Sequence, residues 1–158
     1  RANFHNPVSQ FIVTLTNPVL RPLRKFIPGY SGIDVASIVL MIVLQMIELL
    51  LITLIYGKSP NPAGLFVLSL GKLLELTVYV LMVAVFVRII ISWVNPHLYN
   101  PFTSLLASLT DFMLLPARRL IPSVGMLDLS PIAVFIVLGL VLRLAVQPIL
   151  DIGAAMLL

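Results

Sequence analysis

The chain has 158 residues, of which 60% are hydrophobic and 10% charged, and its mean hydropathy is +1.13. Soluble domains are about 45–50% apolar and about 25% charged, so this composition excludes a cytosolic globular enzyme, a disordered tail and a secreted disulfide scaffold. It predicts an all-α integral membrane protein. Cysteine is absent, which excludes thiol catalysis, thiolate metal sites and disulfides. We interpret the net charge of +4 as an orientation signal and not as a nucleic-acid-binding surface.

Residues 1–32 form the first predicted element, which is too short and too polar to span a bilayer yet too apolar for a free loop. Its apolar residues recur at helical spacing and define one face: Val8, Phe11, Ile12, Leu15 and Val19. A short amphipathic helix of this kind favours the membrane interface. A half-buried helix beneath the bundle, a re-entrant segment and a soluble loop are the alternatives.

Three stretches are long and apolar enough to span a bilayer, which takes about 20 mostly apolar residues. The first span covers residues 33–57 and is joined by a linker, residues 58–63, to a second span at residues 64–94. A second interfacial segment, residues 95–127, precedes the third span at residues 128–150. Each span contains charged residues, in chain order Glu48, then Lys72, Glu75 and Arg88, then Arg143. Such charges indicate helices that pack against partners.

The chain contains an internal match: residues 6–44, the first matched segment, align with residues 100–138, the second, at an offset of 94 with 14 identities in 39 positions. Chance would give about two or three identities, so the sequence predicts a tandem duplication. The apolar face recurs at Phe102, Leu105, Leu106, Leu109 and Met113. Each repeat would be a span, an interfacial helix, a basic turn and a span, the first incomplete at residues 1–57 and the second at residues 64–158. We therefore expect a four-span parent protein whose first helix is absent from this sequence.

Each matched segment has a proline-flanked basic turn followed by an aspartate. Prolines restrict the backbone there, and arginines can hold lipid phosphates through forked hydrogen bonds. The residues expected to contact lipid or a partner are Arg21, Arg24, Lys25, Arg118 and Arg119. Asp34 and Asp128 precede long apolar helices, whose free amides they are expected to cap. Capping, turning and lipid anchoring explain this pattern, and a docking face for a partner protein, made of Arg118, Arg119 and Asp128, is the alternative.

The second matched segment carries four motifs: Asn100-Pro101, Thr110-Asp111, Pro116-Ala117-Arg118-Arg119-x-Ile121-Pro122 and Asp128-Leu129-Ser130-Pro131. Together they resemble the YggT family, also called YlmG. The first matched segment is looser, because Asn17 replaces the aspartate and Ala36-Ser37 replaces Ser-Pro. The resemblance implies an inner-membrane protein without established enzymatic activity, linked to osmotic tolerance and ion homeostasis. Plastid relatives are linked to haem attachment in a cytochrome complex and to nucleoid or division placement.

No pattern in the sequence predicts an enzyme, a cofactor or a metal site. It has no glycine-rich phosphate loop, no Gly-x-Ser-x-Gly, no Glu-x-x-His and no paired carboxylates. The plastid relatives suggest a haem-ligand hypothesis for His5 and His97. The two histidines do not align at the offset of 94, and no Cys-x-x-Cys-His motif exists, so we expect no haem ligation.

The charge distribution predicts the orientation of the chain. Two spans per repeat place both interfacial segments on one membrane face, which carries six of the ten positive charges: Arg1, Arg21, Arg24, Lys25, Arg118 and Arg119. By the positive-inside rule this face is cytoplasmic, in a bacterial inner membrane, and the C-terminus is periplasmic.

Three functions are compatible with these features. The first is a non-catalytic accessory or assembly protein that acts through helix packing, and the second is an interfacial scaffold that organises anionic lipid. Expected partners are anionic lipid headgroups and a membrane protein or a second copy of this chain, and no nucleic acid. The third is a small oligomeric transporter or channel component, with Glu48, Glu75, Arg88 and Arg143 along the pathway. Three or four helices make a thin wall for a pore, so we do not expect transport by one copy.

Glu48 and Arg143 form the most specific predicted contact. They lie 14 residues after Asp34 and 15 residues after Asp128, which places both about 21–23 Å from the basic face. A lone charge at that depth costs at least about 2.5 kcal/mol, and pairing reduces the cost. We therefore expect an intramembrane ion pair, direct or water-bridged. In the alternatives Arg143 extends toward the periplasmic headgroups, Glu48 is protonated or bonded within its own helix, or Glu75 is the partner.

Overall fold

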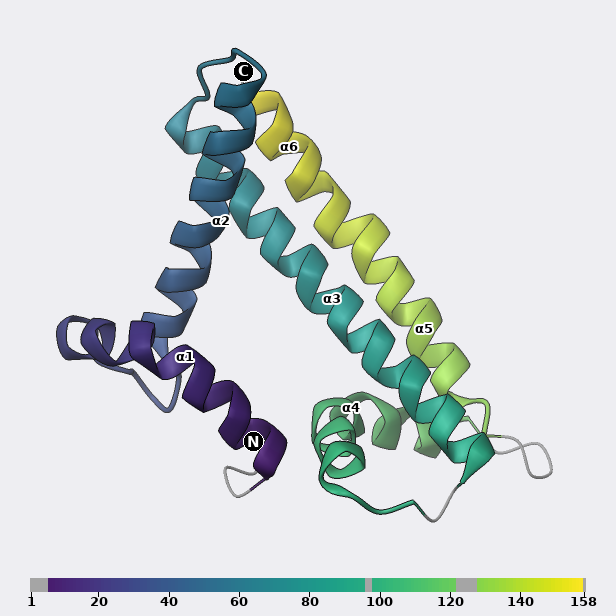
Figure 1. Ribbon diagram of the computed structural model, residues 1–158. Coiled ribbons are helices and arrows are strands. Elements are labelled where there is room, and N and C mark those ends of the chain that lie inside the picture. The colour runs from purple at the N-terminus through teal and green to yellow at the C-terminus, as the bar shows by residue number, and fades with distance from the viewer. Residues whose placement is uncertain (1–5, 96–97, 122–127, 158) are drawn as a thin grey trace. The chain divides into compact units, whose positions relative to one another are not determined.

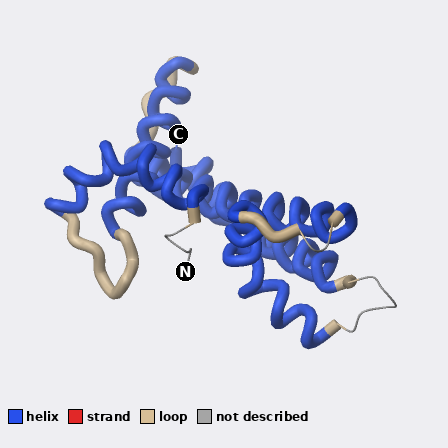
Figure 2. The backbone as a smooth tube through the Cα atoms, turned by 60° about the horizontal axis from the view of Figure 1, so that its bottom comes forward, coloured by secondary structure: helices blue, strands red, loops and turns tan. Residues whose placement is uncertain are grey.

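A computed structural model describes residues 6–95, 98–121 and 128–157 of the chain. Over these residues the protein is all-helical, as expected, and the only β-type pairing in them is an isolated bridge between Tyr30 and Ile33 (Figures 1 and 2). The elements, in chain order, are α1 (Pro7–Phe26), α2 (Val35–Ile55), α3 (Pro62–Val94), α4 (Pro101–Leu120), α5 (Ser130–Val141), the π-helix η1 (Leu142–Val146) and α6 (Gln147–Leu157).

In the described part of the chain, three helices are long and apolar enough to cross a membrane: α2 with 21 residues, α3 with 33, and the continuous run Ser130–Leu157 with 28. At 1.5 Å per residue, even α2 is about 31 Å long, which matches the hydrocarbon thickness of a bilayer. The three predicted spans are thus confirmed as helices. The third continues past the predicted end at residue 150, because the residues after Asp151 are mostly alanine, methionine and leucine, which favour helix.

Contacts divide the chain into two compact units. The first unit consists of Arg1–Thr14 and Val78–Val141, and the second of Leu15–Thr77 and Leu142–Leu158. Helices α1 and α3 and the run α5–η1–α6 each contribute to both units.

In the second unit, glycines bring the start of α3 close to α6, which runs beside it in Figure 1. A Cβ atom on Gly153 would lie 2.6 Å from the backbone nitrogen of Leu68, and one on Gly64 would lie 2.5 Å from the backbone nitrogen of Leu157. The backbone N–H of Asn61 donates a hydrogen bond to the carbonyl of Leu157 at 2.9 Å. Small residues of this kind allow close backbone approach between membrane helices, where packing replaces the hydrophobic effect.

In the first unit, α4 lies against α5 and the end of α3, and it begins at an Asn-Pro motif. Asn100 caps α4, because its side chain accepts a hydrogen bond from the backbone N–H of Thr103 at 2.8 Å while the Thr103 hydroxyl accepts one from the Asn100 N–H at 3.0 Å. Asn6, at the matched position, accepts from the backbone N–H of Val8 at 2.9 Å and donates to the carbonyl of Pro101 at 2.6 Å. Proline in the first turn leaves no amide to satisfy. The two Asn-Pro motifs therefore start α1 and α4, and the hydrogen bond from Asn6 to Pro101 joins the starts of the two helices.

Candidate lipid- and partner-contacting site

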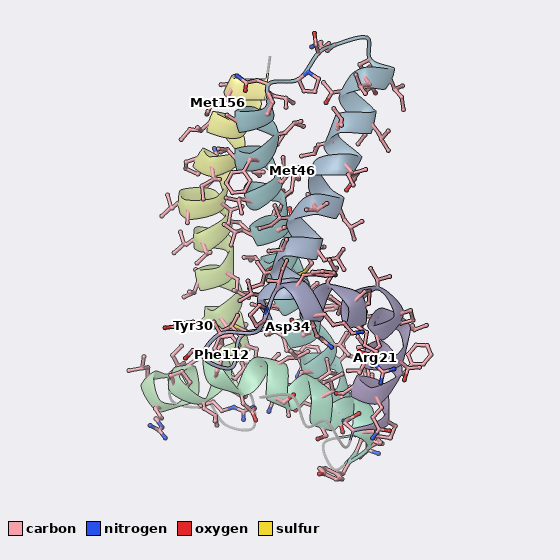
Figure 3. The ribbon with its side chains drawn as sticks, turned by 90° about the vertical axis from the view of Figure 1, so that its left-hand side faces the viewer. Arg21, Tyr30, Asp34, Met46, Phe112 and Met156 are labelled. Atoms are coloured by element: carbon pink, nitrogen blue, oxygen red, sulfur yellow. The ribbon has the colours of Figure 1, made fainter. Side chains whose placement is uncertain are left out.

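The first arginine–aspartate pair joins the last turn of α1 to the start of α2. Nε of Arg24 donates to Oδ2 of Asp34 at 3.1 Å, and Nη2 bonds the same oxygen. Asp34 also caps α2, as expected, because it accepts hydrogen bonds from the backbone N–H of Ser37 at 3.3 Å and from the Ser37 hydroxyl at 2.6 Å. Figure 3 shows Asp34 at the foot of α2. The hydrogen bonds from Arg24 and then from Ser37 lower the pKa of Asp34 to about 2, so its carboxylate is charged at neutral pH.

The remaining terminal nitrogen of Arg24 is also engaged. Nη1 donates to the side-chain oxygen of Asn17, seven residues earlier in α1, at 3.2 Å. Asn17 is the residue that the sequence comparison singled out as a replacement for aspartate. All three nitrogens of this guanidinium therefore bond within the second unit.

The second pair, Arg118 and Asp128, has the same spacing of ten residues. Nε of Arg118 donates to Oδ2 of Asp128 at 2.8 Å, and Oδ1 accepts from the backbone N–H and the hydroxyl of Ser130 at 3.0 and 2.5 Å. Burial alone would raise the pKa of Asp128, but the hydrogen bonds from Ser130 and Arg118 outweigh it and the pKa is lowered. Residues at matched positions thus make the same contact, while the duplication itself stays a prediction.

A further ion pair, which the sequence analysis missed, lies beside the second pair. Nη1 of Arg88, near the end of α3, donates to the hydroxyl of Thr110 at 2.6 Å and to Oδ1 of Asp111 at 2.5 Å. Thr110 is fully buried and donates its own hydroxyl to the carbonyl of Leu106 at 2.7 Å. The signal was present, because a basic residue in a span needs a carboxylate partner and Thr110-Asp111 stood out as a motif.

The end of α3, α4 and the start of α5 enclose a partly open cavity of about 310 Å³ within the first unit. Its lining includes three of the charged residues described above, Arg88, Arg118 and Asp128. The sequence predicted the last two as site residues, but not that they share a cavity with a span arginine.

The other predicted contact residues, Arg21, Lys25 and Arg119, are exposed, and none of them forms an ion pair within the described residues. Arg21 lies on α1 in Figure 3. Arg1, His5 and His97, which the charge count and the haem-ligand hypothesis involve, lie outside the described residues, as does Pro122.

Glu48 and Arg143 form no ion pair in the described part of the chain. Glu48 instead accepts a hydrogen bond from the Gln45 amide at 2.7 Å, within its own helix, which is the alternative stated above. Glu75, the rival partner for Arg143, pairs with Lys72 at 2.9 Å. Arg143 lies exposed in the π-helix. The direct contact is therefore not formed, and a water-bridged contact stays a prediction.

Over the residues that the structure describes, these features define a helical protein of the membrane class, with three helices long and apolar enough to span a bilayer and two amphipathic helices. The sequence profile of the CCB3/YggT family matches residues 2–55 and 67–149, and the chain belongs to this family.

Similar proteins come from several bacteria. An uncharacterised Pseudomonas aeruginosa protein is 42% identical over 149 residues, and the match covers 93% of this chain and 76% of the Pseudomonas protein. A protein from Vibrio alginolyticus is 38% identical, and the match covers 86% of this chain and 74% of the Vibrio protein. The uncharacterised protein YggT of Escherichia coli K12 is 34% identical, with 99% and 80% covered. No solved structure matches the chain.

Proposed function

We propose that this protein is a non-catalytic accessory or scaffold protein of the bacterial inner membrane. It acts through helix packing and through contacts of its interfacial helices with anionic headgroups and a membrane-protein partner. The observation that supports the proposal is that two ion pairs form, Arg24–Asp34 and Arg118–Asp128. Each fixes the end of an amphipathic helix to the start of a spanning helix, which is a positioning role that requires no reaction.

The exposed apolar face of α1 supports lipid contact. The apolar side chains Phe11, Ile12, Leu15 and Val19 of α1 are each at least 50% exposed. An apolar face next to exposed basic residues binds the headgroup boundary of an anionic leaflet. The positive-inside rule supports a cytoplasmic location for this face.

The partner role is tested by removing the exposed charge of the second basic turn. Wild type and a chain carrying Arg118→Gln and Arg119→Gln are expressed in the native host and purified in mild detergent. We expect a membrane protein to co-purify with wild type but not with the variant. The helical circular dichroism of the variant should be unchanged. Lys58→Gln, in the linker on the opposite face, is the matched control. Equal loss with Lys58→Gln, or loss of the partner together with the helical signal, would contradict the proposal. Growth of a deletion strain at high osmolarity tests the osmotic link.

A small oligomeric transporter is the second candidate, favoured by one observation. Glu48 and Arg143 are exposed on spanning helices, where lipid would be a poor neighbour. If these charges line a pathway between copies, Glu48→Gln and Arg143→Gln change ion flux into proteoliposomes. Absence of flux by wild type would exclude this candidate.

A further inference from the structure

We propose that the cavity of the first unit binds the phosphate headgroup of a phospholipid, with Arg118 as its principal donor. The proposal deepens the lipid contact proposed above and rests on it. The ligand group is a phosphate, and it binds at one cavity instead of along a basic surface.

The guanidinium groups at the cavity have unused donors. Asp128 engages Nε of Arg118, and Thr110 and Asp111 engage Nη1 of Arg88. Within the described residues no hydrogen bond engages Nη1 or Nη2 of Arg118. These two nitrogens form the fork that arginine uses to bind phosphate oxygens in pairs. The side chain of Arg118 is 45% exposed, so a ligand can reach it.

The two arginines of the lining are balanced by two carboxylates. Arg88 pairs with Asp111, which lies outside the lining, and Arg118 pairs with Asp128, whose charge is also partly offset by the hydrogen bonds from Ser130. The forked donors of Arg118, and not a net positive charge, therefore favour an anion at this cavity. The Ser104 hydroxyl, also in the lining, offers an uncharged donor.

The rest of the lining favours an amphiphile over a free ion. Val85, Leu98 and Leu106 provide an apolar wall, and Trp93 and Tyr99 lie near the end of α3. Tryptophan and tyrosine are enriched at the depth of lipid headgroups. Arg88 lies six residues before Val94, the last residue of α3, which is about 9 Å along the helix axis. Ligand sites enclose about 300–1,000 Å³, so a cavity of about 310 Å³ fits a headgroup and leaves the acyl chains outside.

The first arginine–aspartate pair differs from the second in its free nitrogens. Asp34 and Asn17 engage all three nitrogens of Arg24, so no unbonded pair of Nη nitrogens is left to form the fork, and Arg24 does not line this cavity. Lys58, in the linker, provides a control, because it carries the same charge as Arg118 and is absent from the lining.

The test is native mass spectrometry of the full chain in mild detergent, titrated with phosphatidylglycerol and, separately, with phosphatidylethanolamine. We expect Arg118→Gln to weaken lipid binding about tenfold, the effect of losing a charge-assisted hydrogen-bond pair. Ala107→Phe fills the cavity without changing its charge and should weaken binding similarly. Lys58→Gln, which removes one positive charge outside the cavity, should remain within about twofold of wild type. Thermal melting of each variant verifies that it is folded.

Three results would overturn the proposal: equal weakening by Arg118→Gln and Lys58→Gln, unchanged binding in Ala107→Phe, or binding of inorganic phosphate with no binding of either lipid. Preference for phosphatidylglycerol supports an anionic headgroup, and equal binding of the two lipids supports recognition of the phosphate alone. Partner co-purification reports the proposed function separately. If lipid binding is insensitive to every variant while the basic-turn variant loses its partner, the cavity proposal fails and the proposed function stands.

Discussion

The two matched segments use the same arginine–aspartate pair but differ in what surrounds it. In the first, Asn17 accepts a hydrogen bond from Arg24, so one arginine bonds two neighbours through all three of its nitrogens. In the second, Asp111 stands at the matched position and bonds Arg88 of α3. A change from amide to carboxylate thus accompanies a second arginine, and among the described residues none bonds the two terminal nitrogens of Arg118 beside the cavity. All three guanidinium nitrogens of Arg24 have partners within the protein, so the first pair has a structural role. Arg118 of the second pair has two terminal nitrogens without a partner among the described residues, and these are available to a ligand.

The largest expected effect comes from breaking the Arg88–Asp111 pair. Arg88→Met leaves the Asp111 carboxylate unpaired next to a buried threonine, and we expect a loss of about 2–4 kcal/mol. For a chain of this size that corresponds to roughly 4–16 °C in Tm, measured by scanning fluorimetry in detergent. Asp111→Asn should lower the Tm in the same direction, and the double variant should recover part of the loss. A double variant that loses the full sum of the two single effects would show that the residues do not interact.

The two caps should respond alike, with a smaller effect. Asp34→Ala and Asp128→Ala each remove a helix cap and an exposed ion pair, for which we expect about 1–2 kcal/mol. Asp34→Asn and Asp128→Asn should recover most of it, because asparagine also caps helices. If alanine and asparagine variants unfold at the same temperature, the capping contribution assigned here is absent.

Acid should weaken the first pair in a defined window. Because the pKa of Asp34 is lowered to about 2 in the folded chain, its carboxylate stabilises the fold above the ordinary aspartate pKa, and this stabilisation is lost as pH falls toward 2. We expect Tm to fall between about pH 4 and pH 2 in wild type, and less steeply in Asp34→Asn. The lowered pKa of Asp128 acts in the same direction. An equally steep profile in Asp34→Asn would contradict the role of this carboxylate.

The smallest effect separates the two segments most sharply. Asn17→Asp gives the first segment the acceptor of the second but leaves Arg24 as its neighbour, so we expect a change within about 0.5 kcal/mol. The reverse change, Asp111→Asn, should cost several times more, because it removes the counter-charge of Arg88. Equal changes in stability for the two variants would show that positions 17 and 111 have equivalent roles.

The sequence predicted local features such as spans and helix caps, but it did not predict which residues pair between helices. Hydropathy located the three spans, and the aspartates before them were identified as caps, because capping depends on residues two or three positions apart. The pairing of Arg88 with Asp111 joins α3 to α4, and no periodicity reports which helix faces meet. Depth arithmetic put Glu48 and Arg143 at one level without fixing the direction in which each points. Gln45 bonds Glu48 within its own helix, and Arg143 lies in a π-helix, whose geometry differs from the α-helical geometry used to place it.

If the first arginine–aspartate pair leaves no free guanidinium fork and the second does, lipid phosphorus contacts Arg118 and not Arg24. Solid-state NMR of chain labelled with ¹⁵N-arginine in phosphatidylglycerol bilayers measures the dipolar coupling between ³¹P and the terminal guanidinium nitrogens, with resonances assigned through Arg118→Lys and Arg24→Lys. We expect ³¹P dephasing of the Arg118 Nη signals and none of the Arg24 Nη signals. Equal dephasing of the two arginines, or none at Arg118, would contradict the account.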